Sequence, residues 1–140
     1  MKAAMLVTLL ALPFSTAYAD TPSVAPAILS GSELSWERVD ENTKRRVFVN
    51  QNETLAVYEI SGGVRSHEIK THTHPQDQIS YILEGQAEVH VGALTRIVGP
   101  GSAYIVPANV PHGMRILTKD YKVIEVFSPG RADLKQTGKE

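Results

Sequence analysis

The stretch HTHPQDQISYILEG, residues 72–85, decides the fold. His72 and His74 stand one residue apart, Gln78 follows four positions after the second histidine, and an apolar run then leads to Gly85. In an extended strand, residues i and i+2 point to the same face about 6 to 7 Å apart, so both imidazoles can converge on one cation. The pair by itself fits two exposed, unliganded histidines at a strand end equally well, because the His-x-His spacing is common.

A second stretch, GSAYIVPANVPH at residues 101–112, supplies a further candidate ligand. It places His112 directly after a turn that Pro107 and Pro111 bracket. The chain contains no cysteine, so any metal must be held by nitrogen and oxygen atoms. A nitrogen-rich site without thiolates suits Ni, Fe, Zn, Cu or Mn rather than Mg or Ca.

Hydrophobic alternation along the rest of the chain has a period of two, which is typical of half-buried strands. No window has the pattern of a core helix, and turns rich in glycine and proline separate the apolar runs. Many short strands at close spacing predict an all-β fold, a single small antiparallel barrel or sandwich that is closed so that few edges stay bare. The predicted strands are residues 46–50, 54–60, 68–72, 78–83, 87–91, 96–98, 103–106, 114–117 and 121–127.

Length and composition predict one globular domain. The chain has 140 residues, of which 42% are hydrophobic and 21% charged, and its formal net charge is -1. This length supports a single core. The small net charge gives no electrostatic reason to expect nucleic acid or an anionic membrane as a partner.

The first 19 residues are predicted to be a signal peptide. Lys2 precedes an apolar run over residues 3–12, and Ala17-Tyr18-Ala19 has the small-x-small pattern of a cleavage site. The run is shorter than the roughly 20 residues that span a bilayer. We therefore expect a periplasmic or secreted protein that leaves the membrane after cleavage near Ala19. The expected order is a flexible leader at 20–35, one domain at 36–134 and a tail at 135–140.

The two stretches resemble the two sequence motifs of the cupin family. Residues 72–85 match the first motif: His, one residue, His, three residues, an acidic or amide ligand, six residues and Gly. Residues 101–112 match the second, with Asn109 at a turn position where cupins commonly have Gly; Asn also tolerates positive φ. The resemblance implies a cupin barrel, also called a jelly roll or double-stranded β-helix. It also implies one divalent transition metal (Ni, Fe, Zn or Mn) on His72, His74, Gln78 and His112.

Gln78 stands where many cupins have Glu. Three neutral imidazoles and one neutral amide cancel none of the formal charge of a dication, so its open positions favour an anionic oxygen. This ligand set predicts a Lewis-acid metal and a small anionic substrate.

The segment VIEVFSPGRADL, residues 123–134, holds the other candidate groups. Alternation puts Glu125 on the strand face of Val123 and Phe127, but neither face is cleanly polar, so Glu125 points either into the barrel or to solvent. A carboxylate in a partly apolar cavity beside a metal is a candidate general acid or base. Arg131 can clamp a substrate carboxylate or be solvated.

This segment resembles the tail of the KdgF type of small single-domain cupins, which act in pectin and alginate breakdown and promote ring opening of 4,5-unsaturated uronates to linear ketouronates. The resemblance implies that Glu125 and Arg131 are catalytic and that Phe127 and Arg131 bind substrate. The sequence departs from that group at Glu125, where the group has Asp, and at Gln76, where it usually has His or another polar residue.

The sequence therefore predicts an isomerase or lyase-like cupin acting on a small anionic sugar acid. One alternative is an iron- or nickel-dependent dioxygenase acting on an enol or phenol, which would consume oxygen. Another is a non-catalytic exported barrel that binds metal or sugar. We also expect a homodimer, because cupins often pair through sheet edges.

Overall fold

The computed structural model describes residues 27–63 and 69–138. This part of the chain folds into strands and turns, and it contains no helix long and apolar enough to cross a membrane. The predicted signal peptide at 1–19 and the first residues of the predicted leader lie outside the described residues. The strands are β1 (Glu37–Arg38), β2 (Thr43–Val49), β3 (Thr54–Ile60), β4 (Asp77–Glu84), β5 (Ala87–Val91), β6 (Leu94–Val98), β7 (Ala103–Val106), β8 (His112–Ile116) and β9 (Tyr121–Ser128).

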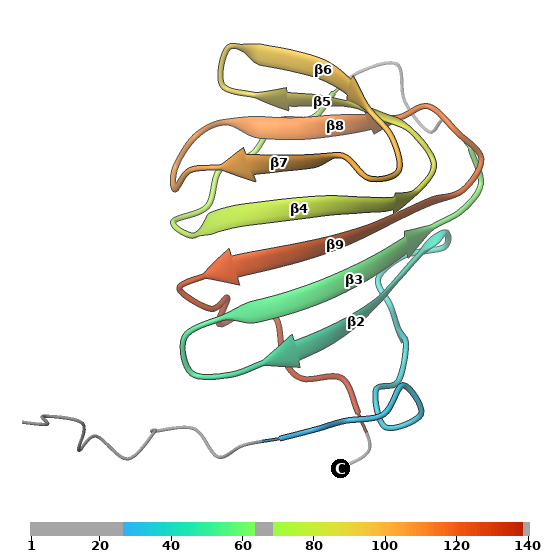
Figure 1. The fold of residues 1–140 in the computed structure, drawn as a ribbon, viewed down its shortest axis with the longest axis vertical. Helices are drawn as coiled ribbons and strands as arrows, with labels where there is room; N and C mark the ends of the chain where they lie inside the picture. The colour runs from blue at the N-terminus through green and yellow to red at the C-terminus, as the bar shows by residue number, and fades with distance from the viewer. Residues whose placement is uncertain (1–26, 64–68, 139–140) are drawn as a thin grey trace, which may run out of the picture.

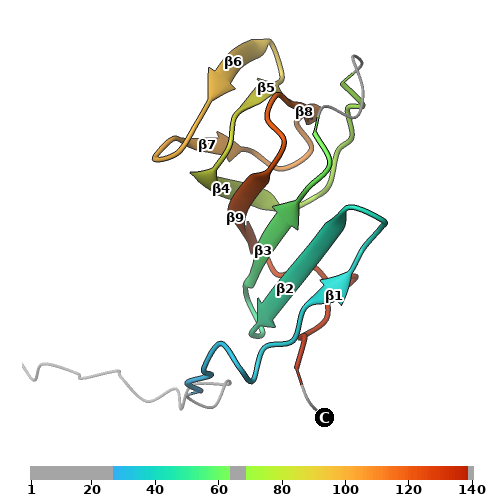
Figure 2. The same ribbon diagram turned by 90° about the vertical axis from the view of Figure 1, so that its right-hand side faces the viewer.

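The strands form two antiparallel sheets (Figure 1). The larger sheet has the order β1-β2-β3-β9-β4-β7, and the smaller has the order β6-β5-β8. Strands that are distant in sequence become neighbours, because β9 lies between β3 and β4. The turned view shows the smaller sheet meeting β4 and β9 at one end of the larger sheet (Figure 2). The predicted all-β jelly roll is confirmed.

Most predicted strands occur within a few residues of their expected limits, but one prediction is wrong. The strand expected at 68–72 is absent from its described part, residues 69–72, which has only a single bridge between His72 and His112. Backbone hydrogen bonds join the two residues in both directions, with N–O distances of 2.9 and 3.0 Å. Alternation in sequence could not show that this segment pairs at one residue only.

The core consists of two apolar clusters. The first joins both sheets, since it contains residues of β4, β5 and β9: Ile82, Ala87, Val89, Tyr121 and Val123. The second lies at the β2–β3 end and is made of Val47, Ala56, Phe127 and Leu134. A cavity lined by both polar and apolar side chains lies on the inner face of β4 and β9.

The C-terminal residues pack back onto β2. Leu134 is only 5% exposed within the second cluster. Thr137 pairs with Val47: its backbone N–H donates to the Val47 carbonyl over 3.0 Å, and its hydroxyl oxygen accepts from the Val47 N–H over 2.9 Å. Part of the segment predicted as a tail therefore belongs to the folded domain.

Candidate metal centre

Three histidines from two segments converge in the structure. The ligand nitrogens of His72, His74 and His112 all lie within 4.8 Å of one another. The bridge between His72 and His112 brings the first segment to the start of β8. The Asn109 N–H donates to the His74 carbonyl over 2.8 Å and holds the second segment beside the first. Asn109 has a φ of 62°, as expected for a residue in the glycine position of the turn.

Hydrogen bonds to backbone carbonyls orient two of the imidazoles. His74 Nδ1 lies 3.0 Å from the carbonyl oxygen of Gln76, and His112 Nδ1 lies 2.9 Å from that of Val110. A carbonyl oxygen can only accept, so each Nδ1 carries the proton. In the neutral ring, each Nε2 then has a free lone pair, which is the usual arrangement of a metal-binding histidine.

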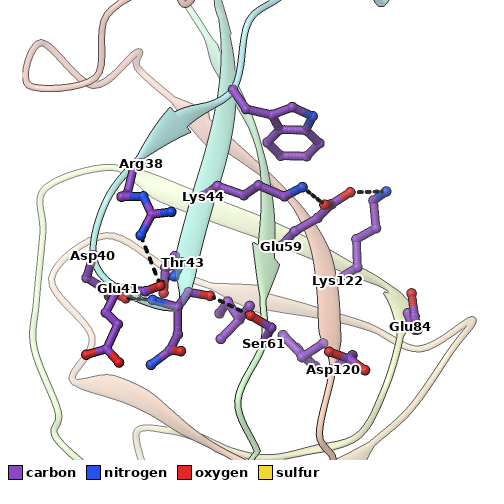
Figure 3. A pocket seen from close by; sticks show the side chains of 14 residues that line it. Arg38, Asp40, Glu41, Thr43, Lys44, Glu59, Ser61, Glu84, Asp120 and Lys122 are labelled. Atoms are coloured by element: carbon purple, nitrogen blue, oxygen red, sulfur yellow. Dashed lines mark hydrogen bonds and ion pairs between the residues drawn. The ribbon is translucent and has the colours of Figure 1, made fainter.

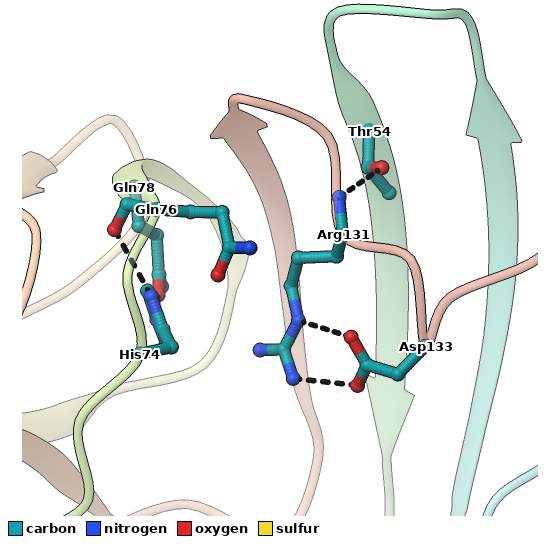
Figure 4. Close-up of polar contacts among 6 residues, drawn as sticks. All are labelled: Thr54, His74, Gln76, Gln78, Arg131 and Asp133. Atoms are coloured by element: carbon teal, nitrogen blue, oxygen red, sulfur yellow. Dashed lines mark hydrogen bonds and ion pairs between the residues drawn. The ribbon is translucent and has the colours of Figure 1, made fainter.

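Two further observations show that the residues fit a cation. His112 Nε2 is buried with no hydrogen-bond partner. His74 Nε2 lies 3.0 Å from Gln78 Oε1 (Figure 4), and in the neutral tautomer both atoms are acceptors. A cation bound by both atoms removes this conflict and gives the buried Nε2 of His112 a partner. His72, His74, Gln78 and His112 are therefore a consistent nitrogen and oxygen donor set for a divalent transition metal.

The electrostatic surroundings favour neutral imidazoles at this site. Partial burial lowers the pKa of His72, and the neighbouring histidines lower it further. Burial also lowers the pKa of His112, although its bond to the Val110 carbonyl opposes the shift. A neutral ring keeps its lone pair available to a metal.

Gln78 connects the histidines to Glu125. Its side-chain Nε2 donates to Ser80 Oγ over 2.9 Å and to Glu125 Oε1 over 3.1 Å, so its oxygen faces His74. A glutamate at position 78 would instead place a second carboxylate beside Glu125. Ser80, which is fully buried, was not predicted as a site residue. Its only sequence signal is its position two residues after Gln78, on the same strand face.

Glu125 points into the barrel, which answers the question that alternation left open. The side chain is 8% exposed, on the buried face of β9. Burial raises the pKa of Glu125 to about 7, although the charge of Arg131 lowers it. Burial and the charge of Glu125 raise the pKa of Tyr104, which lines the same cavity, to about 12. The cavity thus contains a buried carboxyl group whose pKa lies near neutrality.

Arg131 lies across the site from His74 and Gln78 (Figure 4). Its guanidinium forms a two-point contact with Asp133, Nε to Oδ1 over 3.0 Å and Nη2 to Oδ2 over 2.7 Å (Figure 4). Its backbone N–H donates to Thr54 Oγ1 over 2.9 Å. The guanidinium carbon lies 5.2 Å from the ring centre of Phe127, which is 1% exposed and also contacts His74. Asp133, which sequence reasoning missed, therefore holds the arginine in a defined orientation.

These residues surround a cavity of about 350 Å³. Three metal-ligand candidates, the buried acid and the arginine all line it, together with aromatic and apolar side chains: His72, Gln78, His112, Glu125, Arg131, Tyr58, Tyr104, Phe127 and Met114. A second hollow of about 560 Å³ lies near the β1–β2 turn (Figure 3). There Glu59 bridges Lys44 and Lys122, and no histidine lines the hollow. The cavity with the histidines is therefore the candidate functional site.

Known proteins share both the sequence pattern and the fold. Residues 56–127 match the family described as Cupin domain. The chain belongs to the cupin family. This cupin is 31% identical over 104 residues to the pectin degradation protein KdgF of Dickeya dadantii (strain 3937), across 72% of this chain and 91% of that protein.

Two further relatives extend the comparison. The structure of KdgF from Halomonas sp. matches this cupin with a TM-score of 0.68 and 27% identity, across 78% of this chain and 98% of that one. The H2HPP isomerase of Bacillus subtilis is 41% identical over 59 residues, which are 41% of this chain and 25% of that protein. Together with the three-histidine group, these relatives indicate a metal-binding cupin enzyme.

Proposed function

We propose that this cupin is a metal-dependent isomerase that opens the ring of a 4,5-unsaturated uronate to give the linear ketouronate. The observation that carries the proposal is one cavity lined by two of the three converging imidazoles, those of His72 and His112, together with a buried carboxyl group and an oriented arginine. Similarity to two KdgF proteins over most of their length supports the choice of substrate.

The proposed metal ligands are His72, His74, Gln78 and His112, and the ion is Ni, Fe, Zn or Mn. When bound, such an ion supplies a Lewis acid for an anionic or carbonyl oxygen. All four ligands are neutral, so a carboxylate or hydroxyl oxygen of the substrate is a favourable further ligand.

The protein's own groups supply orientation and proton transfer. Ring opening is a net isomerisation: the bond between C1 and the ring oxygen breaks, the C1 hydroxyl loses its proton as C1 becomes an aldehyde, and C4 gains a proton as C5 becomes a ketone. We assign to Arg131 the binding of the substrate carboxylate. Its Nε and Nη2 contact Asp133, and its third guanidinium nitrogen, Nη1, takes no part in that contact and can donate to the substrate. Glu125 is the carboxyl group that can carry the proton between oxygen and carbon.

Phe127 packs against both Arg131 and His74. Its ring lies against both Arg131 and His74, with centres 5.2 Å from the guanidinium carbon and 5.5 Å from the imidazole. We propose that it forms the apolar floor on which the substrate ring packs.

The test is loss of the double-bond absorbance of an unsaturated uronate with metal-loaded protein, measured above the spontaneous rate. Glu125→Gln should lower kcat by at least about a hundredfold, as expected for loss of a general acid or base. Glu88→Gln, which removes a carboxylate that pairs with Arg115 and does not line the cavity, is the matched control and should retain activity. Equal traces for Glu125→Gln and wild type, or no turnover with any metal, would contradict the proposal. Substrate-dependent oxygen uptake would favour a dioxygenase instead.

The expected export to the periplasm or the cell exterior stays a proposal. It rests on the N-terminal pattern that ends at Ala19.

A further inference from the structure

Tyr58, which lines the cavity, belongs to a row of side chains that crosses the larger sheet. The strand register places Glu37 of β1 beside Arg45 of β2, and Arg45 beside Tyr58 of β3. The next member of the row is Val123 of β9, which is fully buried. Residues that are paired in register point to the same face of a sheet. A charged pair at the edge strands is therefore aligned with a hydroxyl group in the cavity wall.

Packing fixes the position of the Tyr58 ring. The ring packs against both apolar clusters of the core. Glu125 is in register with Ala56, two positions before Tyr58 on β3, so the tyrosine and the acid are diagonal neighbours on adjacent strands. Aromatic and long side chains can reach a diagonal neighbour. The residue beside both of them, Ala56, has only a methyl group as its side chain, so it does not separate them.

The charges of the site act on the Tyr58 hydroxyl. Burial raises the pKa of Tyr58, and the charge of Glu125 raises it further. A hydrogen bond with Arg45 opposes this shift, as do the positive charges of Arg45 and Arg131. The hydroxyl therefore keeps its proton at neutral pH, and it lies close enough to Glu125 and Arg131 to respond to both.

Arg45 leaves the Tyr58 proton available to another group. Arg45 Nε donates to Glu37 Oε2 over 2.8 Å, and the arginine side chain is only 19% exposed. The same guanidinium forms a hydrogen bond with the Tyr58 side chain. A guanidinium has donors only, so the tyrosine oxygen accepts from Arg45 and its own O–H can donate elsewhere. Because Tyr58 lines the cavity, a bound substrate can be the acceptor.

The proposed contact with Arg131 places one substrate oxygen on this side of the cavity. The carbon of the substrate carboxylate is bonded to C5, and the ring oxygen is bonded to C5 as well. When the bond between C1 and the ring oxygen breaks, that oxygen gains negative charge and becomes the enol, and then the ketone, oxygen of C5. A fixed hydrogen-bond donor at this oxygen stabilises the transition state more than it stabilises the bound substrate.

We propose that Tyr58 is a further catalytic residue, whose hydroxyl donates a hydrogen bond to the ring oxygen of the substrate as that oxygen leaves C1. Tyr58 keeps its own proton, and Glu125 carries the proton that reaches C4. Arg45 and Glu37 are positioning residues, because they act on the substrate only through Tyr58. The inference rests on the ring opening proposed above and extends the site to β1, β2 and β3.

Steady-state kinetics of metal-loaded protein with an unsaturated uronate tests the role of Tyr58. Tyr58→Phe keeps the packed ring and removes only the hydroxyl. We expect kcat to fall by about a hundredfold, as for loss of one donor to a developing oxyanion, while KM changes by less than about twofold. Tyr81→Phe is the matched control. It removes a hydroxyl from the outward face of β4, where Tyr81 is 46% exposed, and should keep wild-type kinetics.

A double-mutant cycle tests the positioning role of Arg45. Arg45→Met should lower kcat by about tenfold, because the hydroxyl loses its hydrogen bond with a charged group. In Tyr58→Phe the same change should have no further effect, since there is no hydroxyl to orient. Melting temperatures check that all variants fold. If Arg45→Met does not fold, Glu37→Gln takes its place in the cycle, because the Glu37 side chain is 46% exposed.

The outcomes separate this inference from the reaction on which it rests. Wild-type kcat in Tyr58→Phe, or a rise in KM alone, would overturn the inference and leave the ring opening in place. An equal loss from Arg45→Met in both backgrounds would overturn the positioning role.

If wild type does not turn over the uronate, the ring opening itself is wrong, and binding of oxamate decides on Tyr58. Oxamate has a carboxylate next to a carbonyl, as the ketouronate has at C6 and C5. Calorimetry should then show about tenfold weaker binding to Tyr58→Phe than to wild type. Equal affinities, or no binding to wild type, would overturn the inference as well.

Discussion

At the scale of single residues, Gln78 joins two parts of the site. Its amide oxygen faces the histidines, while its amide nitrogen donates to Glu125 and to Ser80. An amide accepts through its oxygen and donates through its nitrogen, whereas an ionised carboxylate at the same position could only accept. Two features therefore favour a neutral Gln78 over a glutamate. Its amide nitrogen can donate to the buried Glu125, and its amide oxygen cancels none of the formal charge of a bound metal ion.

Exchanging the amide and the carboxyl group between positions 78 and 125 tests the contact between Gln78 and Glu125. Gln78→Glu should lower the free energy of unfolding of metal-free protein by about 2 kcal/mol or more, because it removes a buried hydrogen bond and brings two carboxyl groups together. The double variant Gln78→Glu with Glu125→Gln restores one amide and one acid and should recover most of that loss. Urea unfolding at neutral pH measures both. Glu125→Gln alone completes the cycle, and a loss in the double variant equal to the sum of the two single losses would show that the two side chains are not coupled.

At the scale of elements, the turn between β4 and β5 depends on Gly85. This residue has a φ of 77°, and a Cβ there would clash with the backbone carbonyl of Asp120 and lie 2.5 Å from Thr118 Oγ1. The turn therefore packs directly against the start of β9. The spacing from Gln78 to Gly85 in the first motif reflects this close approach at the far end of β4.

Two glycine substitutions separate backbone conformation from crowding. Gly101 has a similar φ of 84°, but nothing lies within 4 Å of a Cβ there. Gly101→Ala should cost about 1 kcal/mol, from the positive φ alone. Gly85→Ala should cost about 3 kcal/mol or more, because overpacking against backbone is added. Urea unfolding of both variants compares the costs, and equal values would argue against the crowding at Gly85.

At the scale of the whole molecule, the candidate metal site joins the two sheets. Gln78 lies on β4 of the larger sheet and His112 on β8 of the smaller one, while His72 and His74 lie on the segment that precedes β4. A metal held by these residues would hold the sheets together at the cavity. Binding to the folded state alone stabilises it by about 2.7 kcal/mol when the free metal is at a hundred times its dissociation constant.

Metal removal should therefore lower the melting temperature. For a domain of this size, about 2.7 kcal/mol corresponds to roughly 10 °C. His112→Ala should abolish the shift on adding metal back. His90→Ala should keep it, because His90 pairs with Glu88 and is not one of the converging histidines. Calorimetry of chelated and reloaded protein makes the measurement, and a shift retained in His112→Ala would remove that residue from the ligand set.

The sequence by itself determined the features that depend on local spacing. Alternation of period two located most strands, and the two motifs picked out three histidines that the structure brings within 4.8 Å. Asn109 was expected to tolerate positive φ and has a φ of 62°. These features follow from bond geometry and side-chain direction over a few residues.

The tertiary structure alone decided the features that depend on which strands become neighbours. Glu125 is buried because β9 lies between β3 and β4, where its inward face meets Gln78 and Ser80. The contacts of Ser80 and Asp133 and the single-residue bridge at His72 were not predicted for the same reason. Each depends on contacts between residues far apart in sequence or on cross-strand register, and alternation within one strand contains no information about its partners.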